Sequence, residues 1–487
     1  MTYEHSPGTG RGAVRIAGGT IAALALMSVA GAALAQATDA VTAAVPAAVT
    51  SAPVPDKGDT TWVMVSAILV MMMTIPGLAL FYGGLVRSRN VLSVLMQVLA
   101  VFSVMAILWV CVGYSLAFTG AGDAAAAGPL TPFIGGLSKA FLSGVTTSSV
   151  AETFSAGVFI PELSFVIFQM AFACIAPALI VGATAERMKF VAILAFVVIW
   201  FVFSYLPMAH MVWWWGGPSA FDAPSGFLFG HGALDFAGGT VIHINAGVAG
   251  LVAAMVAGPR IGYRKELMAP HNLTLTMVGG CLLWIGWFGF NAGSNLEANG
   301  LTALAIINTA VATAAAALAW AAGEWAMRGH PSLLGGVSGA VAGLVGVTPA
   351  AGFVGPMGAI AIGLAAGLIC MWVVVSLKSR IGIDDSLDVF GIHGVGGIVG
   401  AILTGVFAAP SLGGTGVYDY AAGAVAEFSM GSQVYAQALG VVICVLWSGI
   451  VSFVAIHLVR VTVGLRVSAT DERQGLDLTT HGENAYN

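Results

Sequence analysis

Long apolar stretches recur along nearly the whole chain, from Thr61 to Val461, and they constrain its fold more than any other feature. Stretches of about 18 or more mostly apolar residues mark helices that span a lipid bilayer. The 487 residues are 58% hydrophobic and only 8% charged, whereas an ordinary soluble domain carries roughly a quarter charged residues. A chain of this composition has too few charged residues to cover a surface that faces water. The sequence therefore predicts an all-α polytopic membrane protein.

Charged or Gly- and Pro-rich breaks divide the apolar stretches into eleven expected transmembrane helices. Small residues let helix backbones approach closely where apolar attraction between helices is absent, and the chain has 65 Gly residues. The expected ranges are 62–86, 91–118, 161–185, 190–208, 238–258, 272–291, 300–323, 332–349, 356–377, 390–408 and 433–461.

The first 35 residues have the pattern of a secretory signal peptide. Arg11 and Arg15 precede an apolar stretch at 16–30, and the small residues of Ala33-Leu34-Ala35 suit a cleavage site. The alternative is an uncleaved first helix, but the run is short and a polar, Pro-containing linker follows it up to Thr60. We therefore expect four parts: a signal peptide at 1–35, an extracytoplasmic linker at 36–60, a membrane domain at 61–461 and a cytoplasmic regulatory tail at 462–487.

Lys and Arg residues are divided unequally between the two sides of the expected membrane domain. Thirteen lie on one side, and only Lys57 and Lys139 lie on the other. Because cytoplasmic loops are enriched in Lys and Arg, we expect the C-terminal tail in the cytoplasm and the mature N-terminus outside a cell inner (plasma) membrane. The thirteen are Arg87, Arg89, Arg187, Lys189, Arg260, Arg264, Lys265, Arg328, Lys378, Arg380, Arg460, Arg466 and Arg473.

Cysteine usage and net charge exclude several other classes of protein. The odd number of cysteines, five, and their positions inside apolar runs argue against a disulfide framework and against a CxxC metal site. The net charge of −5 is spread along the chain, so no basic patch predicts binding to nucleic acid.

Two histidines, His243 and His393, lie within expected membrane spans, one in each half of the chain. The runs 235–247 and 388–397 that contain them are weakly similar, although their spacing differs. Five helices per half would form an inverted 5+5 repeat followed by an eleventh helix, an architecture that places a substrate path near the midplane. A lone buried His is more often structural, but opposed repeats can bring two together, where neutral rings would line a path with donors and acceptors.

Asp235 lies eight residues before His243, which is a little over two helical turns. One interpretation is that its carboxylate caps the start of the following helix. The other is that it transfers a proton, and the two roles are compatible.

Aromatic side chains form a second cluster of interest near one end of the expected spans. Rings three or four residues apart usually pack in a core, but a ring face beside a hydroxyl oxygen also suits a small cation. Tryptophans at the same end are equally expected as membrane-interface anchors. The cluster consists of Phe168 and Phe172 in the third span, Trp287 and Phe290 in the sixth with Ser294 after them, and Trp213, Trp214 and Trp215.

Several segments together resemble the Amt/Mep/Rh ammonium transporter family, on its bacterial Amt side. They are 76–84, 168–175, 186–190, 235–250, 287–294, 384–400 and 475–486, and the resemblance covers residues 61–487. It implies an ammonium transporter rather than an enzyme, with eleven helices, no cofactor and no metal. It also implies a homotrimer with one pore per subunit, inhibited by a PII-type signalling protein at the cytoplasmic face.

The resemblance also assigns roles to the residues singled out above. It implies an outer ammonium site at Trp213, Phe172 and Ser294 with Asp235 nearby, a gate of Phe172 and Phe290, a pore centre of His243 and His393, and pore-lining or supporting roles for Phe168 and Trp287. Two departures affect this assignment. The run Trp213-Trp214-Trp215 leaves the choice of indole open, and segments 119–160 and 214–234 are longer than in the compact family pattern.

Ammonium differs from potassium in having a proton to lose. A bare cation in an apolar pore has a desolvation cost of at least several kcal/mol. For an amine-like acid with a pKa of roughly 10, releasing the proton at neutral pH costs about 4 kcal/mol, and desolvation depresses a buried cation's pKa by about 3 to 5 units. We therefore expect ammonium to deprotonate at the pore mouth and ammonia to cross beside the histidines, with or without the proton.

Two rival functions use the same features. The two histidines would also suit a single noncovalent haem, although one haem serves an electron-transfer chain poorly. A nutrient sensor is the second rival, but only about 26 residues follow Val461, without a recognisable signalling domain. The patterned tail, with Gly475-Leu-Asp477 and His481-Gly-Glu483, is instead expected to pack against the cytoplasmic loops and couple subunits.

Overall fold

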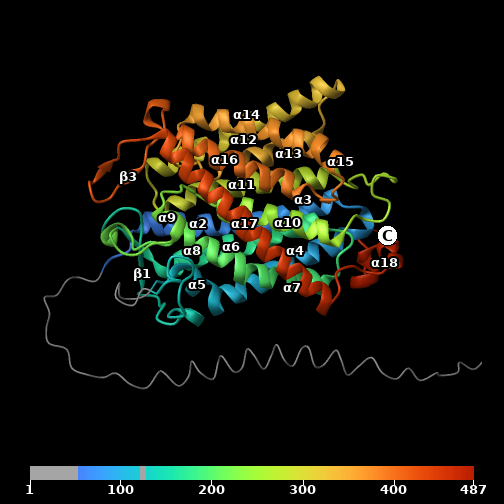
Figure 1. Ribbon diagram of the computed structural model, residues 1–487, viewed down its shortest axis with the longest axis horizontal. Helices are drawn as coiled ribbons and strands as arrows, with labels where there is room; N and C mark the ends of the chain where they lie inside the picture. The colour runs from blue at the N-terminus through green and yellow to red at the C-terminus, as the bar shows by residue number, and fades with distance from the viewer. Residues whose placement is uncertain (1–52, 121–127, 487) are drawn as a thin grey trace, which may run out of the picture. The chain divides into compact units, whose positions relative to one another are not determined.

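The computed structural model describes residues 53–120 and 128–486. The expected signal peptide and most of the linker after it lie outside the described residues. The described chain is a bundle of helices with two short antiparallel hairpins (Figure 1). The hairpins pair β1 (Val150–Glu152) with β2 (Phe159–Pro161) and β3 (Tyr418–Asp419) with β4 (Ala424–Val425).

The first half of the bundle runs to residue 257, and several of its helices include a π-helical or 3₁₀ segment (η). Its elements are α2 (Lys57–Met72), η1 (Met73–Leu78), α3 (Ala79–Leu85), η2 (Ser88–Asn90), α4 (Val91–Leu108), η3 (Trp109–Gly113), α5 (Tyr114–Phe118), η5 (Ala140–Leu142), α6 (Glu162–Thr184), α7 (Phe190–Trp200), η6 (Phe201–Tyr205), α8 (Leu206–Trp213), η7 (Pro218–Ala220), α9 (Phe227–Gly230), η8 (Gly239–Ile244) and α10 (Asn245–Ala257).

The second half continues to the tail. Its elements are α11 (Leu273–Ala292), η9 (Gly293–Asn295), α12 (Gly300–Arg328), α13 (Leu333–Val347), α14 (Pro356–Trp372), η10 (Val373–Leu377), α15 (Lys378–Ile381), η11 (Phe390–Gly394), α16 (Val395–Phe407), η12 (Pro410–Leu412), α17 (Met430–Thr462), α18 (Ala469–Gln474) and η13 (Asp477–His481).

Polar side chains in the loops set where several of these helices begin. The side chains of Asn272, Asn299, Ser332 and Ser429 accept hydrogen bonds from backbone N–H groups in the first turn of the helix that follows each of them. Such caps satisfy donors that a helix start otherwise leaves without partners. The short turns between the apolar stretches therefore carry the signals that divide them into helices.

Ten of the helices in the described part of the chain are long and apolar enough to cross a membrane. They are Lys57–Leu85, Ser88–Phe118, Glu162–Thr184, Phe190–Trp213, Gly239–Ala257, Leu273–Asn295, Gly300–Arg328, Pro356–Leu377, Phe390–Phe407 and Met430–Thr462. The remaining expected span, 332–349, forms α13, which has 15 residues. That is shorter than the roughly 20 residues that usually span a bilayer.

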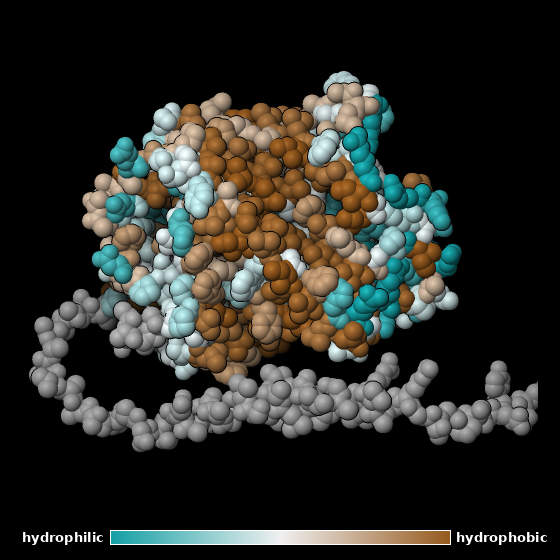
Figure 2. Space-filling view, viewed as in Figure 1, coloured by the Kyte–Doolittle hydropathy of each residue, from teal (hydrophilic) through white to brown (hydrophobic). Residues whose placement is uncertain are grey.

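The surface agrees with a membrane environment. Figure 2 shows an apolar belt across the middle of the helical bundle, with hydrophilic residues gathered at its two ends. We call the end with β1, α9 and β3 the vestibule end, and the end with α15 and α18 the tail end (Figure 1).

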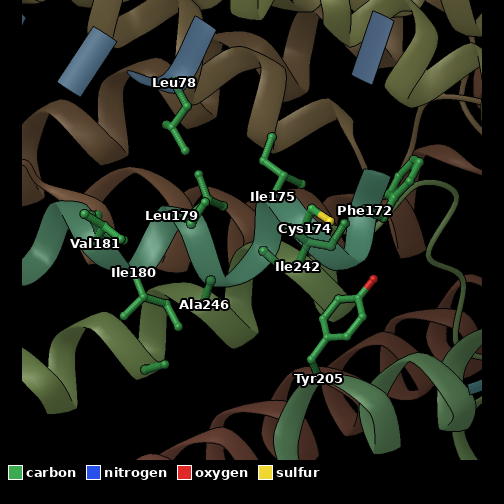
Figure 3. Packing of buried hydrophobic residues seen from close by; sticks show 14 of the residues in the cluster. Leu78, Phe172, Cys174, Ile175, Leu179, Ile180, Val181, Tyr205, Ile242 and Ala246 are labelled. Atoms are coloured by element: carbon green, nitrogen blue, oxygen red, sulfur yellow. The ribbon is translucent and has the colours of Figure 1, made fainter. Parts of the chain in front are cut away.

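The interior is packed largely with aliphatic side chains and small residues. Figure 3 shows Ile175, Leu179 and Ile180 of α6 within this core, near Ile242 and Ala246. All five residues are at most 3% exposed. This part of the core is therefore apolar, although other buried positions in the described chain hold polar side chains.

Candidate functional site

His243 and His393 lie against each other in the interior of the bundle. Their Nδ1 atoms are 3.2 Å apart and their ring centroids 5.3 Å apart, with the ring planes 16° from parallel. The sequence analysis expects this contact. In such a pair one Nδ1 donates and the other accepts, so one remaining Nε2 is an acceptor and the other a donor. Nε2 of His243 is buried and has no hydrogen-bond partner among the described residues, which leaves it available to a polar guest.

Glycines let the two histidine-bearing helices approach this closely. A Cβ atom on Gly247 would overlap the backbone of Gly394, and one on Gly397 would lie 2.9 Å from the carbonyl oxygen of Gly239. Real Cβ atoms do not approach other atoms so closely, so larger residues at these crossings would separate the helices. The glycine-rich sequence around each histidine is therefore what brings the two rings together.

Asp235 caps the helix that carries His243. Its two carboxylate oxygens accept hydrogen bonds of 2.6 to 3.1 Å from the four backbone N–H groups of residues 238–241. Four donors at a helix start also hold a negative charge through the helix dipole. The capping interpretation of Asp235 therefore matches its contacts, and a proton-transfer role remains a separate hypothesis.

Asp385 makes the corresponding contact before His393, and the sequence analysis did not single it out. Its carboxylate accepts hydrogen bonds from the backbone N–H groups of Val389 and Phe390. Asp385 precedes His393 by eight residues, the same spacing as Asp235 and His243. Asp388, the first residue of the run 388–397, does not make this contact, because its side chain pairs with Lys378 at 2.6 Å. Counting back eight residues from each histidine would have identified Asp385.

Aromatic rings continue from the histidine pair toward the vestibule end. Phe172 and Phe290 have ring centroids 4.4 Å apart at 30°, and Phe290 lies 5.8 Å from the ring of His243. Trp287 stacks on His243 at 5.3 Å and 18°, and Phe168 packs edge-on against Phe172 at 4.9 Å. The phenylalanine pair therefore lies beside His243, and Phe290 is the member in contact with it.

The three consecutive tryptophans have different surroundings. The ring of Trp213 is edge-on to Phe172 at 6.1 Å, and its Nε1 donates to the backbone oxygen of Asp235 at 2.9 Å. Trp214 stacks on His210 at 4.5 Å, whereas Trp215 packs against Phe229 at 5.2 Å. Of the three, Trp213 is therefore the indole in contact with the phenylalanine pair.

A cavity of about 1280 Å³ occupies the vestibule end and reaches this aromatic group. Phe172, Trp213, Asp235 and Ser294 all line it. The Ser294 hydroxyl donates to the carbonyl oxygen of Phe290 at 2.8 Å, which leaves its oxygen able to accept. The residues expected to form an outer cation site thus share one cavity, with the phenylalanine pair and then the histidines beyond it.

The histidine geometry does not match two ligands on opposite faces of one haem. Two axial ligands of one haem bind the iron from opposite sides at about 2.0 Å each, so their nitrogens would be roughly 4 Å apart. The two Nδ1 atoms are closer than this, at 3.2 Å. Within residues 53–120 and 128–486, no group of three or more His, Cys, Asp or Glu side chains is arranged to hold a metal ion. The distance between the two Nδ1 atoms therefore does not favour the haem alternative.

A buried ionic network lies at the tail end. Arg260 pairs with Glu186 and with Asp384, each at 2.8 Å, and Arg87 pairs with Glu186 at 3.0 Å. Burial alone would raise the pKa of Glu186, but the guanidinium groups of Arg260 and Arg87 hold it below its usual value. The hydrogen bonds from Arg260 likewise outweigh burial and lower the pKa of Asp384. Both carboxylates therefore stay ionised at neutral pH.

The C-terminal tail packs on this end of the bundle. The Glu472 carboxylate accepts from the backbone N–H of Ile261 at 2.7 Å, directly after Arg260 in the chain. The Asp477 carboxylate accepts from Ser93 N–H at 2.8 Å, and His271 contacts the Tyr486 hydroxyl at 2.9 Å. The tail therefore contacts the connection between α10 and α11 at two points and the start of α4, as its patterned sequence predicts.

Comparisons with known proteins match almost the whole described chain. A family model described as the Ammonium Transporter Family matches residues 61–486. An ammonium transporter of Aquifex aeolicus (strain VF5) is 46% identical over 432 residues, covering 89% of this chain and 94% of the relative. One from Bacillus subtilis (strain 168) is 45% identical over 433 residues, covering 88% and 98%.

Solved structures agree with these relatives. The chain is similar to Saccharomyces cerevisiae Mep2 with a TM-score of 0.73 at 32% identity, covering 86% of this chain and 89% of that one. A structure described as a Sensor Amt Protein gives a TM-score of 0.76 at 28% identity, with coverage of 87% and 98%.

Proposed function

The chain belongs to the ammonium transporter family, and from this premise we propose that it recruits ammonium at the vestibule end and conducts it as ammonia past His243 and His393. The observation that carries this proposal is the order in which the cavity, the aromatic side chains and the histidine pair contact one another. The cavity meets Trp213 and the phenylalanine pair, and the histidine pair follows directly behind.

Recruitment is assigned to the part of the cavity where Trp213, Phe172 and Ser294 come together. Indole and phenyl faces attract a small cation, and the Ser294 oxygen can accept a hydrogen bond from it. Asp235 contributes negative charge close by, although its oxygens are already occupied by backbone donors. The site therefore attracts ammonium without binding it so tightly that it is trapped.

Passage beyond this site favours ammonia over any bare cation. Phe172 and Phe290 would act as a gate, because their rings are at most 1% exposed and close the way to the histidines. Potassium would lose its water there with nothing to replace it, at a cost of at least several kcal/mol. Ammonium can instead release its proton for about 4 kcal/mol at neutral pH, and ammonia then meets the donor and acceptor of the two imidazoles.

The same proposal includes an inverted repeat, an eleventh membrane span and an orientation in the membrane. Equal Asp-to-His spacing in the two halves, and a π-helical segment at each histidine, support an inverted 5+5 repeat with α17 as an eleventh span. This count includes α13 (Leu333–Val347) as a short membrane span. The concentration of Lys and Arg at the tail end supports a cytoplasmic tail, an external vestibule and an inner-membrane location.

Regulation and assembly follow from the tail and from family membership. We assign the tail, residues 462–487, to the control of transport, because its Glu472 contacts Ile261, directly after Arg260 of the ion network. A homotrimer and inhibition by a PII-type protein at the tail end complete the proposal.

Uptake into liposomes that contain the purified protein tests this function. Ammonium-dependent uptake or current should appear, and removing both rings in the double His243→Ala, His393→Ala variant should reduce it while leaving the protein folded. Measuring with and without an imposed proton gradient shows whether the proton accompanies ammonia. Uptake no faster than in protein-free liposomes, from protein that remains monodisperse, would reject the proposed function.

A further inference from the structure

The vestibule cavity is far larger than the ammonium site at its inner end requires. Its volume of about 1280 Å³ exceeds the roughly 300 to 1,000 Å³ of typical small-molecule pockets. Its outer walls come from residues 139–156 and 214–234, within segments expected to be longer than the family pattern, and from the loop that carries β3 and β4. These walls contain a second group of aromatic and acidic side chains that the proposed transport path does not use.

The aromatic part of this outer wall is centred on Trp215 and Tyr420. Their ring centroids are 5.0 Å apart, and Trp215 also packs near Phe154 at 6.1 Å and Phe229 at 5.2 Å. Tyr420 adds Phe221 at 5.7 Å, and all five residues line the cavity. Ring faces in this wall that no neighbouring ring covers can attract a cation.

Glu297 is a buried carboxylate that lines the same cavity. It is 7% exposed, and its carboxylate accepts hydrogen bonds of 2.7 to 3.0 Å from Thr153, Ser155 and Asn299. All of these donors are neutral. Burial and, to a smaller extent, the Glu297 carboxylate raise the pKa of Tyr420 to about 12.

Charge balance over the whole cavity is negative. Among its lining residues, Lys139 is the single basic side chain, and it pairs with Glu162. Glu152 is a further lining carboxylate, and it accepts hydrogen bonds from Ser219 and from the backbone of Gly157, which are also neutral. Glu152 and Glu297 are therefore not matched by a cation in the part of the chain that the structure describes.

We propose that the outer vestibule holds a second cation site, formed by Trp215, Tyr420 and Glu297, that binds ammonium and small alkylammonium ions before they reach Trp213. This inference rests on the proposed function, since it concerns the delivery of the same substrate. Aromatic faces attract ammonium groups through their quadrupole, and a low-dielectric cleft of one charge sign raises the local concentration of the opposite ion. The site raises capture at low substrate concentration and leaves the later transfer step unchanged.

Kinetics of methylammonium uptake in liposomes test the site. Trp215→Leu and Glu297→Gln should each raise KM about 3- to 10-fold at low ionic strength, with kcat unchanged. The Glu297→Gln effect should shrink at about 1 M salt, where the screening length falls to roughly 3 Å. Asp222→Asn is the matched control, because this exposed acid at the same end does not line the cavity, and its KM should equal that of the wild type.

Tetramethylammonium provides a second readout, because it carries the cationic charge but is too bulky to follow ammonium between Phe172 and Phe290. It should inhibit wild-type uptake competitively, and Trp215→Leu or Tyr420→Leu should weaken that inhibition several-fold. These variants keep Glu297 and its hydrogen bonds, so they test the second cation site even if Glu297→Gln folds poorly.

The outcomes separate the two proposals. A wild-type protein that does not transport rejects the proposed function itself. A wild-type protein that transports, together with Trp215→Leu and Tyr420→Leu variants whose KM and inhibition match those of Asp222→Asn, overturns the second site alone.

Discussion

Replacing Asp235 with Asn tests how the helix of His243 is held. The carboxylate accepts from four backbone N–H groups, two at each oxygen. An amide keeps one oxygen and turns its NH₂ toward the other two donors, so two buried N–H groups lose their acceptor. Each buried donor left without a partner costs about 1 to 3 kcal/mol. The Asp235→Asn variant should therefore lose about 2 to 6 kcal/mol of stability, concentrated at η8, where His243 lies.

Asp385→Asn is the matched comparison, because its carboxylate accepts from only two backbone N–H groups. One donor is left without an acceptor, so the expected cost is about 1 to 3 kcal/mol. Thermal unfolding of both detergent-solubilised variants should rank Asp235→Asn below Asp385→Asn and both below the wild type. Liposome uptake should fall in the same order. An Asp235→Asn protein as stable as the wild type would refute the capping account, and if that protein also failed to transport, proton transfer by Asp235 would be favoured.

Three further predictions concern the gate, the tail and acid pH. The double Phe172→Ala, Phe290→Ala variant should stay folded but change its rate and admit other cations, so unchanged ion selectivity in liposomes would reject the gate. Deleting the tail after Leu465 should reduce transport or abolish inhibition by a PII-type protein without preventing membrane insertion, and full activity with normal inhibition would show the tail dispensable. Because the pKa values of Glu186 and Asp384 are lower in the folded protein, their stabilisation is complete above the unfolded pKa of about 4 and is lost as pH falls through the lower folded values. The thermal unfolding midpoint should therefore be flat from about pH 7 to 5 and drop below about pH 4, and a midpoint unaffected by acid would contradict this.

The membrane spans were predictable because a lipid bilayer requires each span to be long and mostly apolar. Ten of the eleven expected ranges correspond to helices that are long and apolar enough to cross a membrane. The structure adds π-helical segments such as η8 and η11, which hydropathy does not reveal because they change the backbone pattern and not the composition. The 15-residue α13 shows the limit of the method, since its length alone does not establish a span.

The candidate site was predictable where a residue type is rare in its setting. Histidines inside apolar spans are conspicuous, and so His243 and His393 could be paired before their contact was known. Asp385 was missed because it stands in a loop among other acids, where a carboxylate is unremarkable until its backbone partners are seen. The choice among the three tryptophans depended on side-chain direction after the end of α8, which the sequence does not specify.

The outer wall of the vestibule was the least predictable part. The sequence showed only that two segments were longer than the family pattern. Trp215 and Tyr420 are separated by more than 200 residues in the chain, and their contact depends on how two irregular loops fold over the bundle. Such contacts arise from tertiary structure, and no local pattern predicts them.

The central claim is that the apolar path carries ammonium because ammonium can lose a proton, and comparing two cations of the same charge tests it most directly. Ammonium and potassium fluxes should be measured in the same preparation of liposomes, at equal concentrations and equal driving force. The account predicts rapid ammonium-dependent transport and potassium flux no greater than in protein-free liposomes. Potassium flux through the wild-type protein at a rate comparable to that of ammonium would contradict it, because potassium has no proton to release.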